Sequence, residues 1–276
     1  MAALRGVNFP CFFNAYGHDL APNAVLGRRP DRFHPMQIYR PLLKARALGF
    51  EAVHLPLCEG GEGILLDDGA IRGVHPVLVE SIAIIQECAS LSGLRLYWTL
   101  LDGHSMERCG DTLTRAILDG QDATARFAEH VAAAIVRRLD PKLTLAIEVV
   151  KAPEALVANY GESLDRGWDS MRSAIGTIAD AIRSERAATI VTAGVSMSAL
   201  AALWQGVSCL DAIDVHIADD VARLPSRTEV IGAMANAASA ASALPLIAGA
   251  ASITQLSDPN YSAVFYRASA ELEKAG

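Results

Sequence analysis

Polar side chains that could act as acids, bases or nucleophiles follow several apolar, strand-like segments of this 276-residue sequence. They are Asn14, His54, Glu59, Asp102, His104, Lys151, His216 and Asp219. Two carboxylates such as Glu59 and Asp102 support inverting hydrolysis of a glycosidic bond when about 6.5 to 9.5 Å separates them. A partly desolvated lysine such as Lys151 can instead form a Schiff base with a carbonyl substrate. Simpler interpretations also stay open, namely solvated carboxylates and an ion-paired Lys151.

Glu148 is the one charged residue inside the apolar run 143–150. Strand alternation predicts that Glu148 and Ala152 point to the same side, with Glu148 two layers deeper. A buried carboxylate has to be paired. We therefore expect a structural role for Glu148, held by an arginine or by backbone N–H groups.

The sequence gives no indication of a metal or a cofactor. The five cysteines are scattered and include no Cys-x-x-Cys pair, which argues against a zinc site and a disulfide framework. Histidines 18, 34, 75 and 130 show no ligand spacing. The glycines of 59–63 are not followed by Gly-Lys-Ser/Thr and do not form Gly-x-Gly-x-x-Gly, so a nucleotide site is not predicted.

Composition limits the partners and the compartment. Hydrophobic residues make up 51% of the chain, which is ample for a large core, and the net charge of −7 argues against binding to nucleic acid or anionic membranes. No apolar run reaches the ~18 residues that a membrane-spanning helix needs. The start of the sequence lacks a basic flank followed by an apolar region, so we expect a cytoplasmic protein.

Strand-like and helix-like segments alternate along the whole sequence, which is typical of βα units in a single domain covering 1–276. We expect strands at 6–9, 52–57, 94–101, 143–150, 188–192, 212–216 and 245–249. We expect helices at 33–48, 76–91, 122–138, within 164–186 and at 227–243. This alternation predicts a (β/α)8 barrel of the TIM type, with functional residues at the carboxyl ends of the strands.

The last segment leaves the eighth strand in question. Apolar residues recur at helical spacing over 259–274, which predicts a seventh helix after Asp258-Pro259. Residues 264–267 would then have to serve as a short eighth strand, or the chain ends one βα unit early. The second alternative is favoured, and it would expose apolar edges that a homodimer is one way to cover.

Several strand-like segments resemble the barrel strands of the clan A glycoside hydrolases, in particular family 5-like cellulases and mannanases. Ile147-Glu-Val-Val, followed by Lys151-Ala152-Pro153-Glu154, is similar to the fourth strand, which in that family ends in Asn-Glu-Pro-Glu. Other likenesses are Gly6-Val-Asn-Phe, Val53-His-Leu-Pro-Leu, Leu101-Asp-Gly-His and Asp214-Val-His. The resemblance covers nearly the whole chain and is most specific over 111–154.

The sequence departs from this family at both catalytic positions. The resemblance implies that Ala152 stands in place of the general acid/base glutamate and Ala250 in place of the nucleophile. Retaining hydrolysis needs two carboxyl groups about 5 Å apart, and methyl groups cannot replace them.

Two hypotheses for the function follow from this loss. The first is a glycosidase-like protein that binds a saccharide or glycoconjugate without retaining hydrolysis. The second is an active enzyme with relocated groups, either an inverting hydrolase using Glu59 and Asp102 or a lyase using Lys151. A barrel with a purely structural or assembly role is a third interpretation.

Overall fold

Seven parallel strands form one curled sheet in the computed structural model, which describes residues 5–9, 12, 17, 19–27, 35–105, 112–157, 164–217, 244 and 246–251. In spatial order they are β1 (Gly6–Asn8), β2 (Ala52–Pro56), β5 (Arg95–Asp102), β6 (Thr144–Lys151), β7 (Val191–Ser196), β8 (Ile213–Ile217) and β9 (Leu246–Ala251). All neighbours pair in parallel. Seven strands occur as expected, but the fifth, expected at 188–192, lies at Val191–Ser196.

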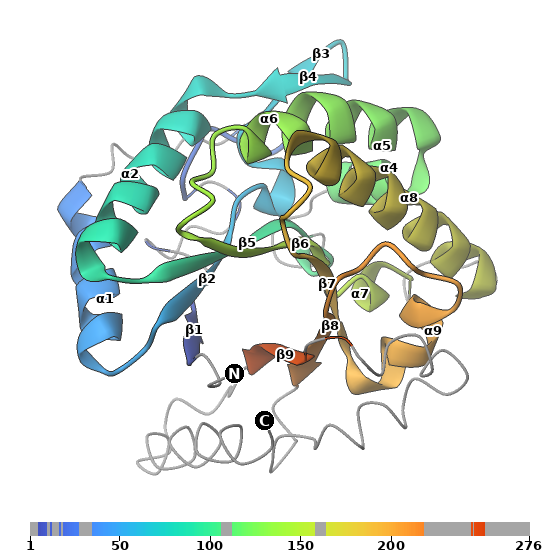
Figure 1. The fold of residues 1–276 in the computed structure, drawn as a ribbon. Coiled ribbons are helices and arrows are strands. Elements are labelled where there is room, and N and C mark those ends of the chain that lie inside the picture. The colour runs from blue at the N-terminus through green and yellow to red at the C-terminus, as the bar shows by residue number, and fades with distance from the viewer. Residues whose placement is uncertain are drawn as a thin grey trace.

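Helices cover the outer, convex face of this sheet (Figure 1). They are α1 (Pro35–Ala47), α2 (Pro76–Ser92), α4 (Leu113–Asp119), α5 (Gln121–Phe127), η2 (Ala128–Ala132), α6 (Ala133–Val136), α7 (Glu154–Val157), α8 (Leu164–Glu185) and α9 (Leu200–Trp204). Short 3₁₀ turns occur at η1 (Glu59–Gly61) and η3 (Met197–Ala199). Each long helix links one strand to the next parallel strand, as in a (β/α)8 barrel.

Local sequence explains where α2 begins and ends. The ring of His75 accepts a hydrogen bond from the Val77 amide at 3.2 Å, and Pro76 occupies the first turn, where its missing N–H costs nothing. Gly93 ends the helix with φ at 68°, a left-handed conformation that glycine adopts without strain. The helix therefore ends just before β5 starts.

A two-stranded hairpin that sequence analysis missed follows β2. It consists of β3 (Ile64–Asp67) and β4 (Ala70–Val74), which pair antiparallel. Asp68 and Gly69 connect them with φ values of 48° and 76°. Asp-Gly is a strong signal for such a turn, so the hairpin was predictable.

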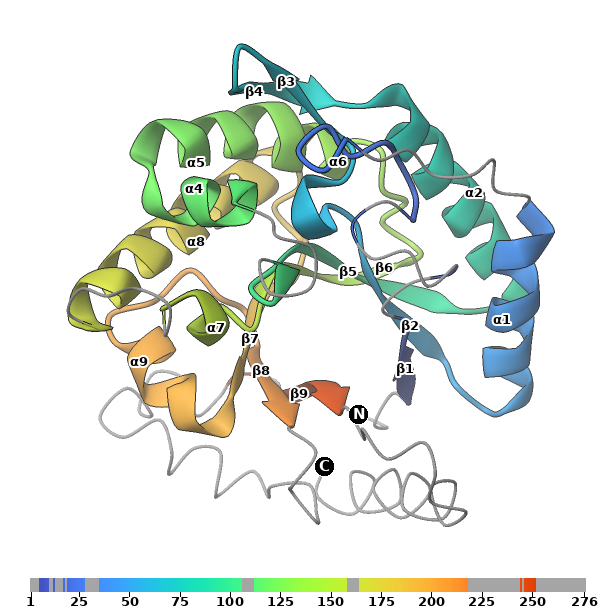
Figure 2. The same ribbon diagram turned by 180° about the vertical axis from the view of Figure 1, so that it is seen from behind.

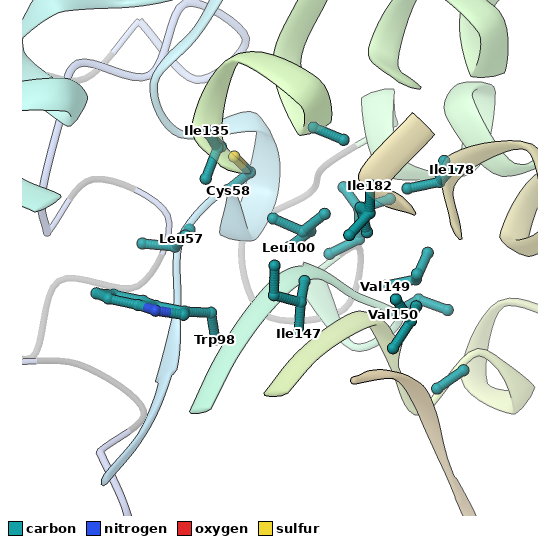
Figure 3. Packing of buried hydrophobic residues seen from close by; sticks show 14 of the residues in the cluster. Leu57, Cys58, Trp98, Leu100, Ile135, Ile147, Val149, Val150, Ile178 and Ile182 are labelled. Carbon is teal, nitrogen blue, oxygen red and sulfur yellow. The ribbon is translucent and has the colours of Figure 1, made fainter. Parts of the chain in front are cut away.

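The main hydrophobic core lies between the sheet and the helices. Figure 3 shows Ile147, Val149 and Val150 of β6 among the buried residues packed there, together with Ile178 and Ile182 of α8. All five side chains are completely buried. Burial of such side chains stabilises the fold by roughly 1.5–3 kcal/mol each.

A bulge in β6 overturns the expected alternation along this strand. Glu148 pairs with Thr192 and Lys151 with Gly194, so three steps along β6 match two along β7. Val149 and Val150 both belong to the outer core as a result. Side chains of a regular strand alternate between its two faces. The extra residue in the bulge therefore shifts every later inward-facing position by one residue. Simple alternation predicted that Ala152 and Glu148 point to the same side of the strand. Because of the bulge, they do not.

The two edge strands of the sheet, β1 and β9, approach each other. Figures 1 and 2 both show β9 next to β1, although the two edge strands do not pair. The segments 227–243, 259–274 and 264–267, for which helices and an eighth strand were considered, lie outside the described residues. In the part that is described, no helix is both long and apolar enough to cross a membrane.

Candidate functional site

A small hollow opens at the carboxyl ends of the strands on the β1 side of the sheet. It is lined by Asn8, His54, Pro56, Thr99, Asp102 and Lys151, and its volume of about 10 Å³ is close to the space that one water molecule needs. Among the described lining residues, Asp102 supplies the one carboxylate.

Backbone hydrogen bonds fix the strand ends around this hollow. The amide of Gly103 donates to the carbonyl of Lys151 at 2.8 Å, and the amide of Ala152 donates to that of Gly194 at 2.8 Å. The amide of His104 donates to Oδ1 of Asp102, also at 2.8 Å. A Cβ added at Gly103 would lie 2.1 Å from the carbonyl oxygen of Ala152, so this close approach requires glycine. The ends of β5, β6 and β7 are thereby held together.

Ala152 lies in this turn with an unusual backbone conformation. Its φ is 48°, a left-handed value that costs a non-glycine residue roughly 1–2 kcal/mol. Its side chain is buried, and it is not among the described residues that line the hollow. Lys151, one residue earlier, occupies the hollow instead.

Beneath the hollow, Glu148 forms the centre of a buried polar layer. Its Oε2 accepts hydrogen bonds from Nε2 of His54 at 2.9 Å and from the hydroxyl of Thr99 at 2.5 Å. Its Oε1 lies 3.0 Å from Nε2 of His216. Glu148 is thus a buried carboxylate, as expected, but histidines rather than an arginine or the backbone hold it.

The two histidines keep Glu148 ionised. Burial disfavours its charge, but the positive charge of His216 and the hydrogen bond from His54 outweigh burial and hold the pKa of Glu148 well below its usual range. Burial also disfavours a charged His216, yet the negative charges of Glu148 and Asp214 raise the pKa of His216 above its ordinary value of 6.5. A carboxylate with so low a pKa cannot act as a general acid near neutral pH.

A second buried carboxylate, Asp214, lies beside this layer. Its Oδ2 accepts hydrogen bonds from the hydroxyls of Tyr97 and Thr192, the latter at 3.3 Å. Burial and the negative charge of Glu148 raise the pKa of Asp214. Burial, followed by the charges of Asp214 and Glu148, raises the pKa of Tyr97, whose ring stacks on that of His54 with centroids 4.3 Å apart.

The structure brings together only part of the predicted set. His54, Asp102 and Lys151 line the hollow, and His104 lies directly beside Asp102. His216, expected in the cleft, lies deeper against Glu148 and is 9% exposed. The backbone of Ala250 pairs with His216, but its side chain is outside what is described, as are Asn14 and Asp219.

Several residues of the site were missed from the sequence. Thr99 and Tyr97 interrupt an apolar strand two residues apart, and Asp214 precedes His216 by two. Polar residues at this spacing on buried strands point to the same face, so the signal was present. Position 194 requires glycine, because a Cβ there would lie 2.0 Å from Nε2 of His216 and 2.3 Å from Oε1 of Glu148.

Glu59 is not among the described residues that line the hollow. It is 2% exposed and lies near Glu62, which accepts a hydrogen bond from the Ala21 amide at 2.6 Å and another from that of Leu20. Burial, together with the negative charges of Asp19 and Glu59, raises the pKa of Glu62 well above its usual value despite these two bonds. The acids Glu59 and Asp102 therefore occupy different surroundings.

Replacement of Glu62 by glutamine is expected to stabilise the protein at neutral pH. Because the folded-state pKa is raised, Glu62 stabilises fully below its unfolded value of about 4.3 and loses this contribution as pH rises through the folded value. Glutamine keeps an acceptor oxygen and cannot ionise. We expect a gain in unfolding free energy on the order of 1 kcal/mol at pH 7, measured by urea denaturation between pH 4 and 8. The exposed variant Glu80→Gln is the control, and a loss of stability in Glu62→Gln would contradict this account.

Comparisons with known proteins define the fold but give no close relative. No family profile matches the sequence, and no curated protein matches it. Its fold is similar to that of the β-mannanase of the blue mussel Mytilus edulis, with a TM-score of 0.60, 15% identity and coverage of 79% of this chain and 71% of the mannanase. For the β-1,4-D-mannanase of Cryptopygus antarcticus the TM-score is 0.62, with 15% identity and coverages of 80% and 69%.

A third similar structure is the exo-β-1,4-mannosidase of Opitutaceae bacterium strain TAV5, with a TM-score of 0.57 and 13% identity over 95% of this chain and 54% of the mannosidase. At such low identity the likeness concerns the fold alone. The chain therefore has a (β/α)8-type barrel fold similar to that of these enzymes, incomplete within the described residues.

Proposed function

We propose that this protein binds a saccharide or glycoconjugate in the hollow at the barrel mouth and does not hydrolyse it by the retaining mechanism. One observation carries the proposal: the described residues that line the hollow include one carboxylate, Asp102, where retaining hydrolysis requires two about 5 Å apart. Glu148 does not supply the missing acid, because it is completely buried and its pKa is held low.

The lining supports a saccharide as the ligand. Asn8, His54, Thr99, Asp102 and Lys151 offer both donors and acceptors, which is what the hydroxyl groups of a sugar require. Structural neighbours that act on β-mannosidic bonds make manno-oligosaccharides the first ligands to test. Because the hollow is so small, the sugar would lie across its mouth and reach these side chains with its hydroxyl groups.

Isothermal titration calorimetry with a panel of oligosaccharides tests the proposal. We expect saturable binding of at least one member, weakened tenfold or more in Asp102→Asn and in Lys151→Met, because a hydrogen bond to a charged group contributes about 1.5–3 kcal/mol. The exposed variants Asp67→Asn and Lys142→Met serve as matched controls and should bind normally. Absence of binding to every saccharide would exclude the proposal.

A second candidate function rests on the position of Lys151. Its side chain lines the hollow, where a carbonyl substrate could reach its amine to form a Schiff base. Borohydride reduction in the presence of aldehyde- or ketone-bearing sugars would then leave a stable adduct on Lys151, detectable by mass spectrometry. Adduct formation with turnover would favour this candidate over simple binding. The inverting pair is less favoured, because Glu59 is not among the described lining residues.

The assembly of the chain remains a prediction from its sequence. We propose a single domain over 1–276, in which the approach of β9 to β1 reduces the exposed sheet edges. Because the space between the two edge strands is small, there is less need for a second copy of the chain to cover exposed sheet edges. Sedimentation equilibrium would decide between monomer and dimer.

A further inference from the structure

Three buried polar atoms beneath the hollow make no hydrogen bond of regular geometry: Oδ1 of Asp214, and the ion-paired atoms Oε1 of Glu148 and Nε2 of His216, which lie 3.0 Å apart. Glu148 and Asp214 are completely buried, and His216 is 9% exposed. An unsatisfied buried polar atom costs about 1–3 kcal/mol, so the bare Oδ1 of Asp214 beside an ion pair that lacks a well-directed hydrogen bond requires an explanation.

These atoms converge on one small region. Nε2 of His216 lies 3.0 Å from Oε1 of Glu148 and 3.8 Å from Oδ1 of Asp214, and all three lie within 4.8 Å of one another. Metal–ligand bonds of about 2.0–2.2 Å place neighbouring ligands on one zinc ion roughly 3 to 4 Å apart. The two spacings to Nε2 of His216 already fall in this range.

The opposite oxygen of each carboxylate is already held by the protein. Oε2 of Glu148 accepts from His54 and Thr99, and Oδ2 of Asp214 accepts from Tyr97 and Thr192. Metal-binding carboxylates are typically oriented by such outer hydrogen bonds. Each carboxylate thus directs towards the same imidazole nitrogen one oxygen that makes no regular hydrogen bond.

We propose that Glu148, Asp214 and His216 form a binding site for one divalent transition-metal ion, with Zn²⁺ as the best fit. One imidazole nitrogen and two carboxylate oxygens suit zinc, and no thiolate belongs to the set. Two ionised carboxylates neutralise a divalent ion, which satisfies the buried site electrostatically. His54 contacts Glu148 and also lines the hollow, so the ion has a route of entry from the barrel mouth.

Zinc binding to the full-length protein provides the test and requires no saccharide, so it is independent of the proposed function. Protein treated with EDTA and then dialysed is titrated with Zn²⁺ in competition with a chromogenic chelator. We expect one zinc per chain with a dissociation constant in the micromolar range or tighter. At a hundredfold excess over that constant, the melting temperature should rise by about 5 °C or more.

Matched variants locate the zinc. Asp214→Asn keeps an oxygen acceptor for Tyr97, and His216→Gln removes the ring nitrogen; each should weaken zinc binding at least a hundredfold. His130→Gln and Cys209→Ser alter a histidine and a thiol outside the three residues and should leave the affinity unchanged. A wild-type protein that takes up well under one equivalent of zinc overturns the proposal, as does undiminished affinity in Asp214→Asn.

Cobalt substitution in the wild-type protein covers the case in which the variants fail to fold. Co²⁺ bound by nitrogen and oxygen ligands gives visible d–d absorption without the strong near-ultraviolet band of a thiolate complex. That spectrum at one equivalent, removed by added Zn²⁺, is the expected result. A thiolate band would assign the metal to a cysteine and would refute the site.

Discussion

Replacement of Gly194 by alanine is expected to lower the free energy of unfolding by about 3–5 kcal/mol or to prevent folding. The added methyl group would lie 2.0 Å from Nε2 of His216 and 2.3 Å from Oε1 of Glu148. Neither side chain has room to retreat, because Glu148 is fixed by His54 and Thr99 in a completely buried layer. The methyl group therefore separates an ion pair that has no access to water.

Gly176, in the interior of α8, provides the matched control. Nothing lies within 4 Å of a Cβ added there, and glycine in a helix interior costs roughly 0.5–1 kcal/mol relative to alanine. Gly176→Ala should therefore stabilise the protein slightly. Urea denaturation of both variants gives the comparison, and equal stability of Gly194→Ala and the wild type would disprove the tight layer described above.

Replacement of Glu148 by glutamine should have a similarly large effect, a loss of about 3–5 kcal/mol. Glutamine keeps the shape of the side chain but removes the negative charge that raises the pKa of His216, so the buried imidazole loses its ion-pair partner. Its amide nitrogen would also face either His54 or His216. The exposed variant Glu129→Gln should change stability by less than about 0.5 kcal/mol.

A double-mutant cycle separates the ion pair from other effects of the Glu148 substitution. If the charge of Glu148 acts mainly through His216, Glu148→Gln combined with His216→Gln should cost clearly less than the sum of the two single losses. Chemical denaturation of the four proteins in the presence of EDTA gives the coupling energy. Strict additivity would mean that the two side chains do not stabilise each other.

The order of the strands was predictable, whereas the identity of the inward-facing residues was only partly so. Alternating apolar strands and amphipathic helices admit few arrangements, and the seven expected strands occur in the expected sheet. Alternation along 143–150 failed because the bulge after Glu148 turns two successive valines to the core. A bulge depends on pairing with a neighbouring strand, which the sequence of one strand does not specify.

The partners of Glu148 could not be predicted for a related reason. His54, Thr99 and His216 come from three other strands, and their contacts depend on the stagger between strands. Sequence analysis placed His54 and His216 near strand ends, missed Thr99, and did not put them in a common layer. The hydrogen bonds from His54 and Thr99 and the contact with His216 became evident only in three dimensions.

The described residues that line the hollow at the barrel mouth include one carboxylate and not a second. Lys151 and Asp102 occupy the hollow, while Glu148 is locked in the layer below by its histidines. These polar groups could bind the hydroxyl groups of a sugar, whereas the pair of acids needed for the retaining route is not found among the described lining residues. We therefore propose that this barrel binds a saccharide without cleaving it by that route.

The most direct test of this account follows product release under conditions of demonstrated binding. A manno-oligosaccharide that binds in calorimetry is incubated with the same protein sample, and reducing ends are measured by chromatography over a day. We predict saturable binding with no release above the buffer rate. Cleavage that retains the anomeric configuration, and that disappears in Asp102→Asn, would contradict the account.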